Sequence, residues 1–160
     1  MPPGVARSYK RPESVLVVVH TRGGQALLLK RADHPDFWQS VTGSLKPDEE
    51  PAAAAVRELF EETGIEAGDR LRDWHKTNRF EILACWRLRY APGTTHNLEH
   101  VYSLELPAAV PVTLNPEEHS EYRWLVLGDA LEKVWSWSNR AAIEALNQGK
   151  SAIYRAGPSP

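Results

Sequence analysis

Cysteine is nearly absent from this sequence. Cys85 is the one cysteine among 160 residues, so no disulfide can form within the chain. A lone thiol suits a reducing compartment, and we therefore expect a cytoplasmic location. Nothing adjacent in the sequence would activate this thiol, so we do not expect Cys85 to be a nucleophile.

Long apolar runs are lacking as well. No run approaches the roughly 18 residues that a membrane-spanning helix needs. The run at 15–19 near the N-terminus is also too short for the core of a signal peptide. We expect neither a membrane partner nor secretion.

The chain has no excess of charge of one sign. Its formal net charge of −2 gives no sign of a surface for nucleic acid. A hydrophobic content of 42% with six tryptophans is enough for a folded core. The length predicts one domain, which we place at 10–148 between a flexible arm at 1–9 and a tail at 149–160. We expect a monomer or a weak homodimer.

Short apolar runs between turn signals predict an α+β fold, with a mixed β-sheet flanked by helices. We expect a strand hairpin in 14–31, a short strand in 39–42, and further strands in 71–76, 79–90, 100–106 and 121–127. Pro51 should open a helix that Gly64 ends. Asp129 and Ser138 should cap two later helices, the second closed by Gly149.

Three carboxylates crowd the end of the first predicted helix. Glu58, Glu61 and Glu62 fall within an arc of about 100°, where like charges repel. Arg57 stands four residues before Glu61 and can pair with it. The carboxylates also lie at the end of the helix that the dipole makes unfavourable for them. A solvated acidic face would explain them, but so would a hard divalent cation. We expect a separate apolar face to pack on the sheet, formed by Ala52, Ala55, Leu59, Val56 and Phe60.

These carboxylates belong to a longer spaced motif, "GSLKPDEEPAAAAVRELFEETGI". It resembles the Nudix box at all nine specified positions, which are Gly43, Glu49, Arg57, Glu58, Leu59, Glu61, Glu62, Gly64 and Ile65. The resemblance implies the Nudix fold, an α/β/α sandwich, in which a loop–helix–loop binds Mg²⁺, or Mn²⁺, and hydrolyses a diphosphate bond. It also implies a small-molecule triphosphate as the partner and no nucleic acid. Gly43, Glu49 and Gly64 would then shape the motif.

The same resemblance implies roles for individual residues. Glu58, Glu61 and Glu62 would bind the metal, and so would Glu118, which the resemblance favours over its neighbours Glu117 and Glu121. The catalytic residues would be Glu58, Glu61, Glu118 and Arg57, with Arg57 orienting a carboxylate. Either Glu118 or a glutamate of the box would take the proton from water.

Segments outside the box resemble Nudix enzymes that act on a pterin triphosphate. They imply that pyrophosphate is removed from 7,8-dihydroneopterin 3′-triphosphate, giving the monophosphate, in folate biosynthesis. Two alternatives stay open within the resemblance. One is hydrolysis of (oxidised) nucleoside triphosphates or dinucleoside polyphosphates, and the other is a non-catalytic module that senses a nucleotide.

Such a substrate suggests further candidates. Lys10 and Arg31 could hold phosphate, and Trp38 and Phe80 could stack on a pterin, although aromatic residues are more often core. Polar groups that could contact the ring or the phosphates are Thr42, Glu81, Ser138 and Asn139. We also expect "WSWSN", at 135–139, to close one wall of the pocket. By contrast, the spacing of His34, His96 and His100 suggests no zinc site, and we place them on the surface.

Overall fold

The computed structural model describes residues 8–156, and side chains as far as residue 149. Most of the predicted arm and the last four residues of the predicted tail lie outside this range. The elements in chain order are β1 (Glu13–Thr21), β2 (Gln25–Arg31), β3 (Trp38–Gln39), β4 (Val41–Ser44), α1 (Pro51–Thr63), β5 (Arg72–Glu81), the 3₁₀-helix η1 (Ala84–Arg89), β6 (His96–Leu106), β7 (His119–Val126), α2 (Leu127–Lys133) and α3 (Trp137–Ala156).

The seven strands form one mixed sheet that branches at β1. Strand β1 runs parallel to β6 along its whole length, whereas every other pairing is antiparallel. On its opposite edge, β1 pairs with β4 near its start and with β2 near its end, at His20. Strand β2 then leads to β3 and β7. Residues of β2, β3 and β4 beside this branch line a common cavity.

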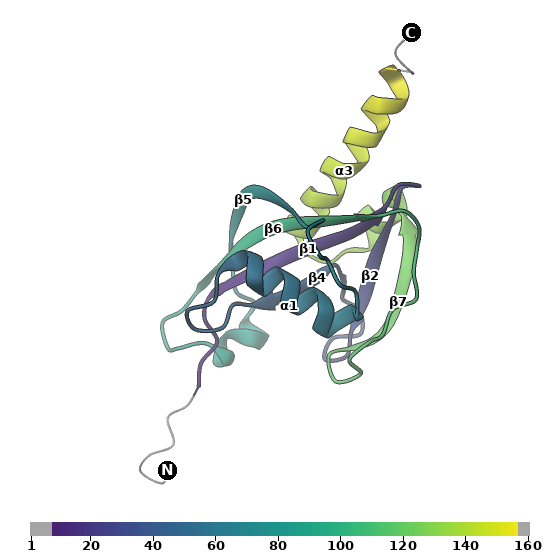
Figure 1. Ribbon diagram of the computed structural model, residues 1–160. Coiled ribbons are helices and arrows are strands. Elements are labelled where there is room, and N and C mark those ends of the chain that lie inside the picture. The colour runs from purple at the N-terminus through teal and green to yellow at the C-terminus, as the bar shows by residue number, and fades with distance from the viewer. Residues whose placement is uncertain (1–7, 157–160) are drawn as a thin grey trace.

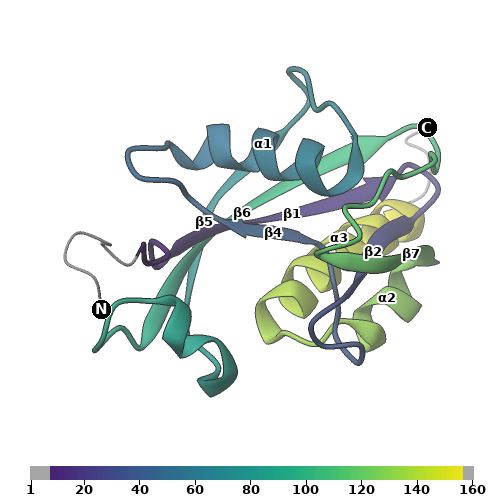
Figure 2. The same cartoon turned by 90° about the horizontal axis from the view of Figure 1, so that it is seen from below.

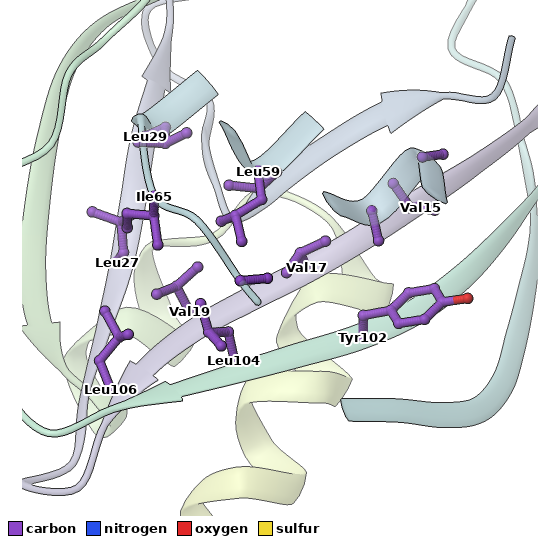
Figure 3. Packing of buried hydrophobic residues seen from close by; sticks show 14 of the residues in the cluster. Val15, Val17, Val19, Leu27, Leu29, Leu59, Ile65, Tyr102, Leu104 and Leu106 are labelled. Carbon is purple, nitrogen blue, oxygen red and sulfur yellow. The ribbon is translucent and has the colours of Figure 1, made fainter. Parts of the chain in front are cut away.

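Helices cover both faces of this sheet. Helix α1 lies on one face, and α2 and α3 lie on the other (Figures 1 and 2). Residues alternate across β1 in the way a buried strand requires. Val15, Val17 and Val19 pack beneath α1 with Leu59 (Figure 3), while Leu16 and Val18 join the core under α2 and α3. The predicted α/β/α sandwich is therefore confirmed.

Helix α1 has the predicted bounds but a different buried face. Gly64 takes a left-handed φ of 74° and its N–H bonds to the Phe60 carbonyl, as expected of a C-cap. The side buried against the sheet includes Leu59 together with Glu58 and Glu62, whereas Val56 and Phe60 are 42% and 53% exposed. Our expectation of separate acidic and apolar faces was wrong. Helix geometry places residues 55, 58, 59 and 62 on one stripe, and that stripe carries carboxylates into the protein.

The strand expected at 79–90 was also wrong beyond Glu81. Pairing between β5 and β6 ends where Glu81 faces His96. The chain then leaves the sheet and forms η1, in which Cys85 is exposed. Trp86 turns back from η1 towards Phe37, with ring centroids 6.1 Å apart. A tertiary aromatic contact thus replaces sheet pairing in this segment.

The C-terminal helices depart from their predicted caps. Among residues 8–149, whose side chains are described, none caps α2, and Asp129 lies inside its first turn. At the start of α3, Ser136 and not Ser138 accepts the N–H of Asn139, at 3.2 Å. The helix continues past Gly149 to Ala156, so Gly149 does not end it. Within the described residues, no helix has both the length and the apolar character needed to cross a membrane.

Candidate active site

Arg57 is the centre of an ion-pair network that ties α1 to the loop before it. Its guanidinium forms two 2.8 Å hydrogen bonds to Glu49, one of 2.8 Å to Glu58 and one of 3.1 Å to Glu61. The pair with Glu61 was predicted from the four-residue spacing. The bonds from Arg57 lower the pKa of Glu49 to about 2. Arg57 therefore orients Glu58 while Glu49 holds Arg57.

Glycine is required at position 43 because Glu58 lies against its backbone. A Cβ at Gly43 would stand 2.1 Å from Glu58 Cδ, well short of the 3.4 Å at which ordinary van der Waals contact begins. Strand β4, which carries Gly43, pairs with β1 and passes beneath α1. The absent side chain thus lets the carboxylate lie over the strand, where it lines a cavity of about 540 Å³.

Glu62 is the most unusual residue of this region. Its side chain is 1% exposed, and neither carboxylate oxygen has a hydrogen-bond partner among the described residues. Burial, followed by direct interaction with the Glu58 carboxyl and by the charges of Glu58 and Glu118, raises the pKa of Glu62 well above its usual value. A buried carboxylate without a partner is costly, so this arrangement needs a compensating group.

The loop that enters β7 brings two further ligand candidates to Glu62. Oxygen or nitrogen atoms of Glu62, Glu118 and His119 all lie within 4.8 Å of one another. Burial and the charges of Glu58 and Glu61 raise the pKa of Glu118. By contrast, burial lowers the pKa of His119 to about 4, which leaves its imidazole neutral at pH 7 and able to ligate.

These residues fit a divalent metal. The unpartnered oxygens of Glu62, the nearby carboxylates and a neutral imidazole are a donor set suited to a small hard or borderline cation. Glu58, Glu62, Glu118 and His119 could hold it. Glu61, also predicted to be a ligand, is exposed and bonded to Arg57, and its role as a ligand stays a prediction. Sequence reasoning missed His119, because a single histidine beside a predicted strand gives no spacing signal.

Basic side chains stand next to this cluster. Lys10 and Arg31 line the same cavity, as does Arg89, which sequence reasoning missed. Burial, with the charges of Arg89 and Arg31, lowers the pKa of Lys10. Arg31 is fixed by two 2.8 Å hydrogen bonds to Asp33 and lies 4.4 Å from the centre of the Trp86 ring. Three cations beside a carboxylate cluster suit an anionic ligand carrying phosphates.

A second cavity, of about 330 Å³, adjoins the first. The two share the lining residues Lys10, Arg31, Gln39, Thr42, Gly43, Ser44 and Arg89. The lining residues of the second cavity include Trp86 and Arg89 of η1 and residues 137–139 of α3, and Figure 2 shows both elements on the face of the sheet opposite α1. A ligand could therefore extend from the carboxylates into a partly aromatic chamber.

The predicted substrate-binding residues all line the second cavity except Trp38, and Lys10 and Arg31 line the first cavity as well. Residues that line the second cavity are Thr42, Phe80, Glu81, Ser138 and Asn139, and the whole segment 135–139 forms one wall. Trp38 does not line it. Its ring is 6% exposed and belongs to the core beneath α2 and α3, with Arg123 and Lys133 each 4.9 Å from it. The prediction that Trp38 faces the substrate was wrong, because β3 directs Gln39 into the cavity and Trp38 to the other side.

Other aromatic residues take the position expected of Trp38. Trp86 and Trp135 line the cavity, and their rings pack edge to face at 5.6 Å. Trp135 also donates a hydrogen bond of 3.0 Å to Gln39. Both ends of the Asn139 amide already form hydrogen bonds within the protein: its oxygen accepts the Ser40 N–H, and its nitrogen donates to the Ser40 hydroxyl. Asn139 therefore anchors α3 to the sheet at the cavity wall.

Comparison with known proteins places this geometry in a family. The family model of the NUDIX domain matches residues 10–146. The chain belongs to the Nudix family. The match spans both the carboxylate cluster and the second cavity. Nudix hydrolases work with a divalent metal, in keeping with the donor set described above.

Two curated Nudix relatives are similar over most of their length. The chain is 44% identical to the dihydroneopterin triphosphate diphosphatase of Escherichia coli strain K12, over 85% of this chain and 92% of that one. It is 39% identical to the protein of the same name from Haemophilus influenzae, over 85% and 87%. A solved structure of the E. coli dihydroneopterin triphosphate pyrophosphohydrolase superposes with a TM-score of 0.81, covering 86% of this chain and 95% of that one at 44% identity.

Proposed function

We propose that this Nudix hydrolase removes pyrophosphate from 7,8-dihydroneopterin 3′-triphosphate, with Mg²⁺ as its metal, and releases the monophosphate. The observation that carries the proposal is the pair of joined cavities. One holds carboxylates and cations suited to a metal triphosphate, and the other is lined by aromatic and polar side chains suited to a flat heterocycle. The curated relatives whose names specify this substrate support the same assignment.

In this proposal Glu58, Glu61, Glu62 and Glu118 hold the Mg²⁺, and His119 is a further candidate ligand. The metal, when bound, would neutralise phosphate charge and polarise the phosphoryl oxygens. Arg57 keeps Glu58 in place through its 2.8 Å hydrogen bond, while Glu49 fixes Arg57. These two residues position a carboxylate and do not contact substrate. Mn²⁺ could serve in place of Mg²⁺, since both prefer oxygen donors.

The chain also supplies a base and charge compensation. Glu118 stands at the edge of the cluster, and its raised pKa makes it a better proton acceptor than an ordinary surface carboxylate. Either Glu118 or a glutamate of α1 takes the proton from the attacking water. Lys10, Arg31 and Arg89 would neutralise the phosphates as charge moves onto the leaving pyrophosphate.

The proposal is tested by the rate of pyrophosphate release from dihydroneopterin triphosphate in Mg²⁺. The same assay is run with dATP and 8-oxo-dGTP, and hydrolysis of diadenosine tetraphosphate is followed by loss of the substrate, since its cleavage yields nucleotides and no pyrophosphate. We expect kcat/KM for the pterin to exceed each of the others by at least about 10-fold, which is about 1.4 kcal/mol of transition-state binding. A flat profile, or a preference for a nucleotide, would remove the pterin assignment and leave a Nudix hydrolase of other triphosphates.

A non-catalytic sensing module is the alternative of another class. All the carboxylates of the motif are present here, which favours an enzyme. Glu62→Gln should abolish turnover and leave the fold intact. A cytoplasmic monomer or weak homodimer remains our expectation, supported on location by the single free thiol.

A further inference from the structure

Two buried polar side chains on β6 face the second cavity and are not explained by the proposed chemistry. Asn97 and Glu99 are 3% and 4% exposed, and both line the cavity. They stand two residues apart and so point to the same side of the strand. The next residue on that side, Val101, belongs to the apolar core beneath α2 and α3. Asn97 and Glu99 thus occupy the end of β6 that lines the cavity, and Val101 is the apolar residue that follows them on this side.

The neighbours of these side chains leave hydrogen-bonding capacity unused. Asn78 lies opposite Glu99 on β5 and donates to it at 3.4 Å. One end of the Asn97 amide bonds to the Ser14 hydroxyl at 2.8 Å, and the other end has no partner among the described residues. A carboxylate can accept about four hydrogen bonds, so Glu99 also has room for more donors.

Stability does not account for a carboxylate at this position. Burial raises the pKa of Glu99, and hydrogen bonds from Ser138 and Asn78 offset this only in part. An apolar residue would pack on this face at lower cost, as Val101 does. A buried carboxylate beside a free amide end, both facing a cavity, is what recognition of a polar ligand edge requires.

We propose that Glu99, assisted by Asn97, reads the 2-amino-4-oxopyrimidine edge that pterins and guanines share. That edge presents a ring N–H beside an amino group, two parallel donors that match the two oxygens of a carboxylate. The free end of Asn97 takes the remaining contact of the amino group. Adenine has an acceptor beside its amino group, and hypoxanthine lacks the amino group altogether. Glu99 is therefore a specificity-determining residue for the ring and has no part in cleaving phosphate.

This inference rests on the proposed function only in requiring a triphosphate with a ring in the second cavity. It can be tested with GTP and ITP, which differ only in the 2-amino group. We expect the wild-type protein to favour GTP over ITP by at least about 10-fold in kcat/KM, because a site built to accept hydrogen bonds discriminates against the analogue that lacks the donor. If turnover of either is slow, their inhibition constants against dihydroneopterin triphosphate give the same ratio.

The variant Glu99→Gln assigns the preference to this residue. Its amide places a donor where the ring also has a donor, so the GTP to ITP ratio should fall to within about threefold of unity. A thermal melt close to that of the wild type shows that the variant is folded. The matched control is Glu105→Gln, the same change on the same strand but at an exposed side chain outside the cavity.

Equal kcat/KM for GTP and ITP in the wild-type protein would overturn the inference. This comparison needs no variant. A preference that survives in Glu99→Gln would overturn it as well. The proposed function fails separately, since a nucleotide could outcompete the pterin while GTP is still preferred over ITP. Conversely, the pterin could be preferred through stacking on Trp86 or Trp135 with no effect of the 2-amino group.

Discussion

The substitution Gly43→Ala should disable the site with little effect on the fold. The new Cβ would lie 2.1 Å from Glu58 Cδ, whereas ordinary contact begins at 3.4 Å. The carboxylate must therefore move by about 1.3 Å, and the hydrogen bond from Arg57 to Glu58 opposes that movement. A misplacement of about 1 Å at a reacting centre can lower a rate by about 100-fold. We expect a loss of this order in kcat.

The stability of Gly43→Ala should change by no more than about 1 kcal/mol. The atom that must move is the end of a flexible side chain, and the backbone at Gly43 is not in the left-handed region. Loss of one hydrogen bond costs about 1 kcal/mol, and the stiffer unfolded chain offsets part of it. Activity should thus fall far more than stability does.

Pyrophosphate release under saturating Mg²⁺ and a thermal melt measure the two quantities. The control is Gly128→Ala in α2, where a Cβ meets no atom within 4 Å. It should keep both its rate and its melting temperature. If Gly43→Ala retained kcat within about twofold, the close approach of Glu58 to β4 would not matter for catalysis, and the reasoning would be refuted.

Two further outcomes follow from burial and charge. Leu59→Ala should lower the free energy of unfolding, measured by urea denaturation, by about 2–5 kcal/mol, because Leu59 is fully buried. Phe60→Ala should lower it by less than about 1 kcal/mol, because Phe60 is 53% exposed. Equal losses in the two variants would mean that α1 is rotated about its axis. Hydrogen bonds from Arg31 lower the pKa of Asp33 from 3.8 to about 2, so Asp33 stabilises the fold above about pH 4 and this contribution is lost as the pH falls towards 2. As the pH falls through that window, the melting temperature of Asp33→Asn should therefore fall less steeply than that of the wild type or of the control Asp69→Asn. Parallel curves of melting temperature against pH would contradict a stabilising ion pair between Arg31 and Asp33.

The motif around α1 was predictable because local geometry determines it. A proline that opens the helix, a glycine that closes it and residues spaced by three or four give bounds and neighbours without tertiary information. The same reasoning misjudged the buried face. It grouped residues by polarity, whereas the stripe that reaches the sheet contains both Leu59 and Glu62.

The second cavity was harder to foresee because contacts between distant segments build it. Trp86 lies in a segment that resembles a strand, and only its packing near Phe37 and Trp135 makes it a wall residue. Trp38 sits one residue from a cavity position, and a shift of one residue in a strand reverses the side chain. Asn97 and Glu99 precede the strand predicted at 100–106, and only the longer β6 places both on one buried side.

The central claim is that Glu62 is buried without a hydrogen-bond partner, with His119 Nε2 3.7 Å from its Oε1, because a divalent cation binds there. The most direct test is a thermal melt of wild type and Glu62→Gln with and without Mn²⁺, which needs no substrate. At about 100 times the dissociation constant, a bound cation adds about 2.7 kcal/mol, or about 5–10 °C for a chain of this size.

We expect that rise in the wild type and a much smaller one in Glu62→Gln, which without metal should be at least as stable because it buries no charge. Glu66→Gln, at an exposed position just after α1, should respond like the wild type. Equal rises in wild type and Glu62→Gln, or no rise in the wild type, would contradict the account.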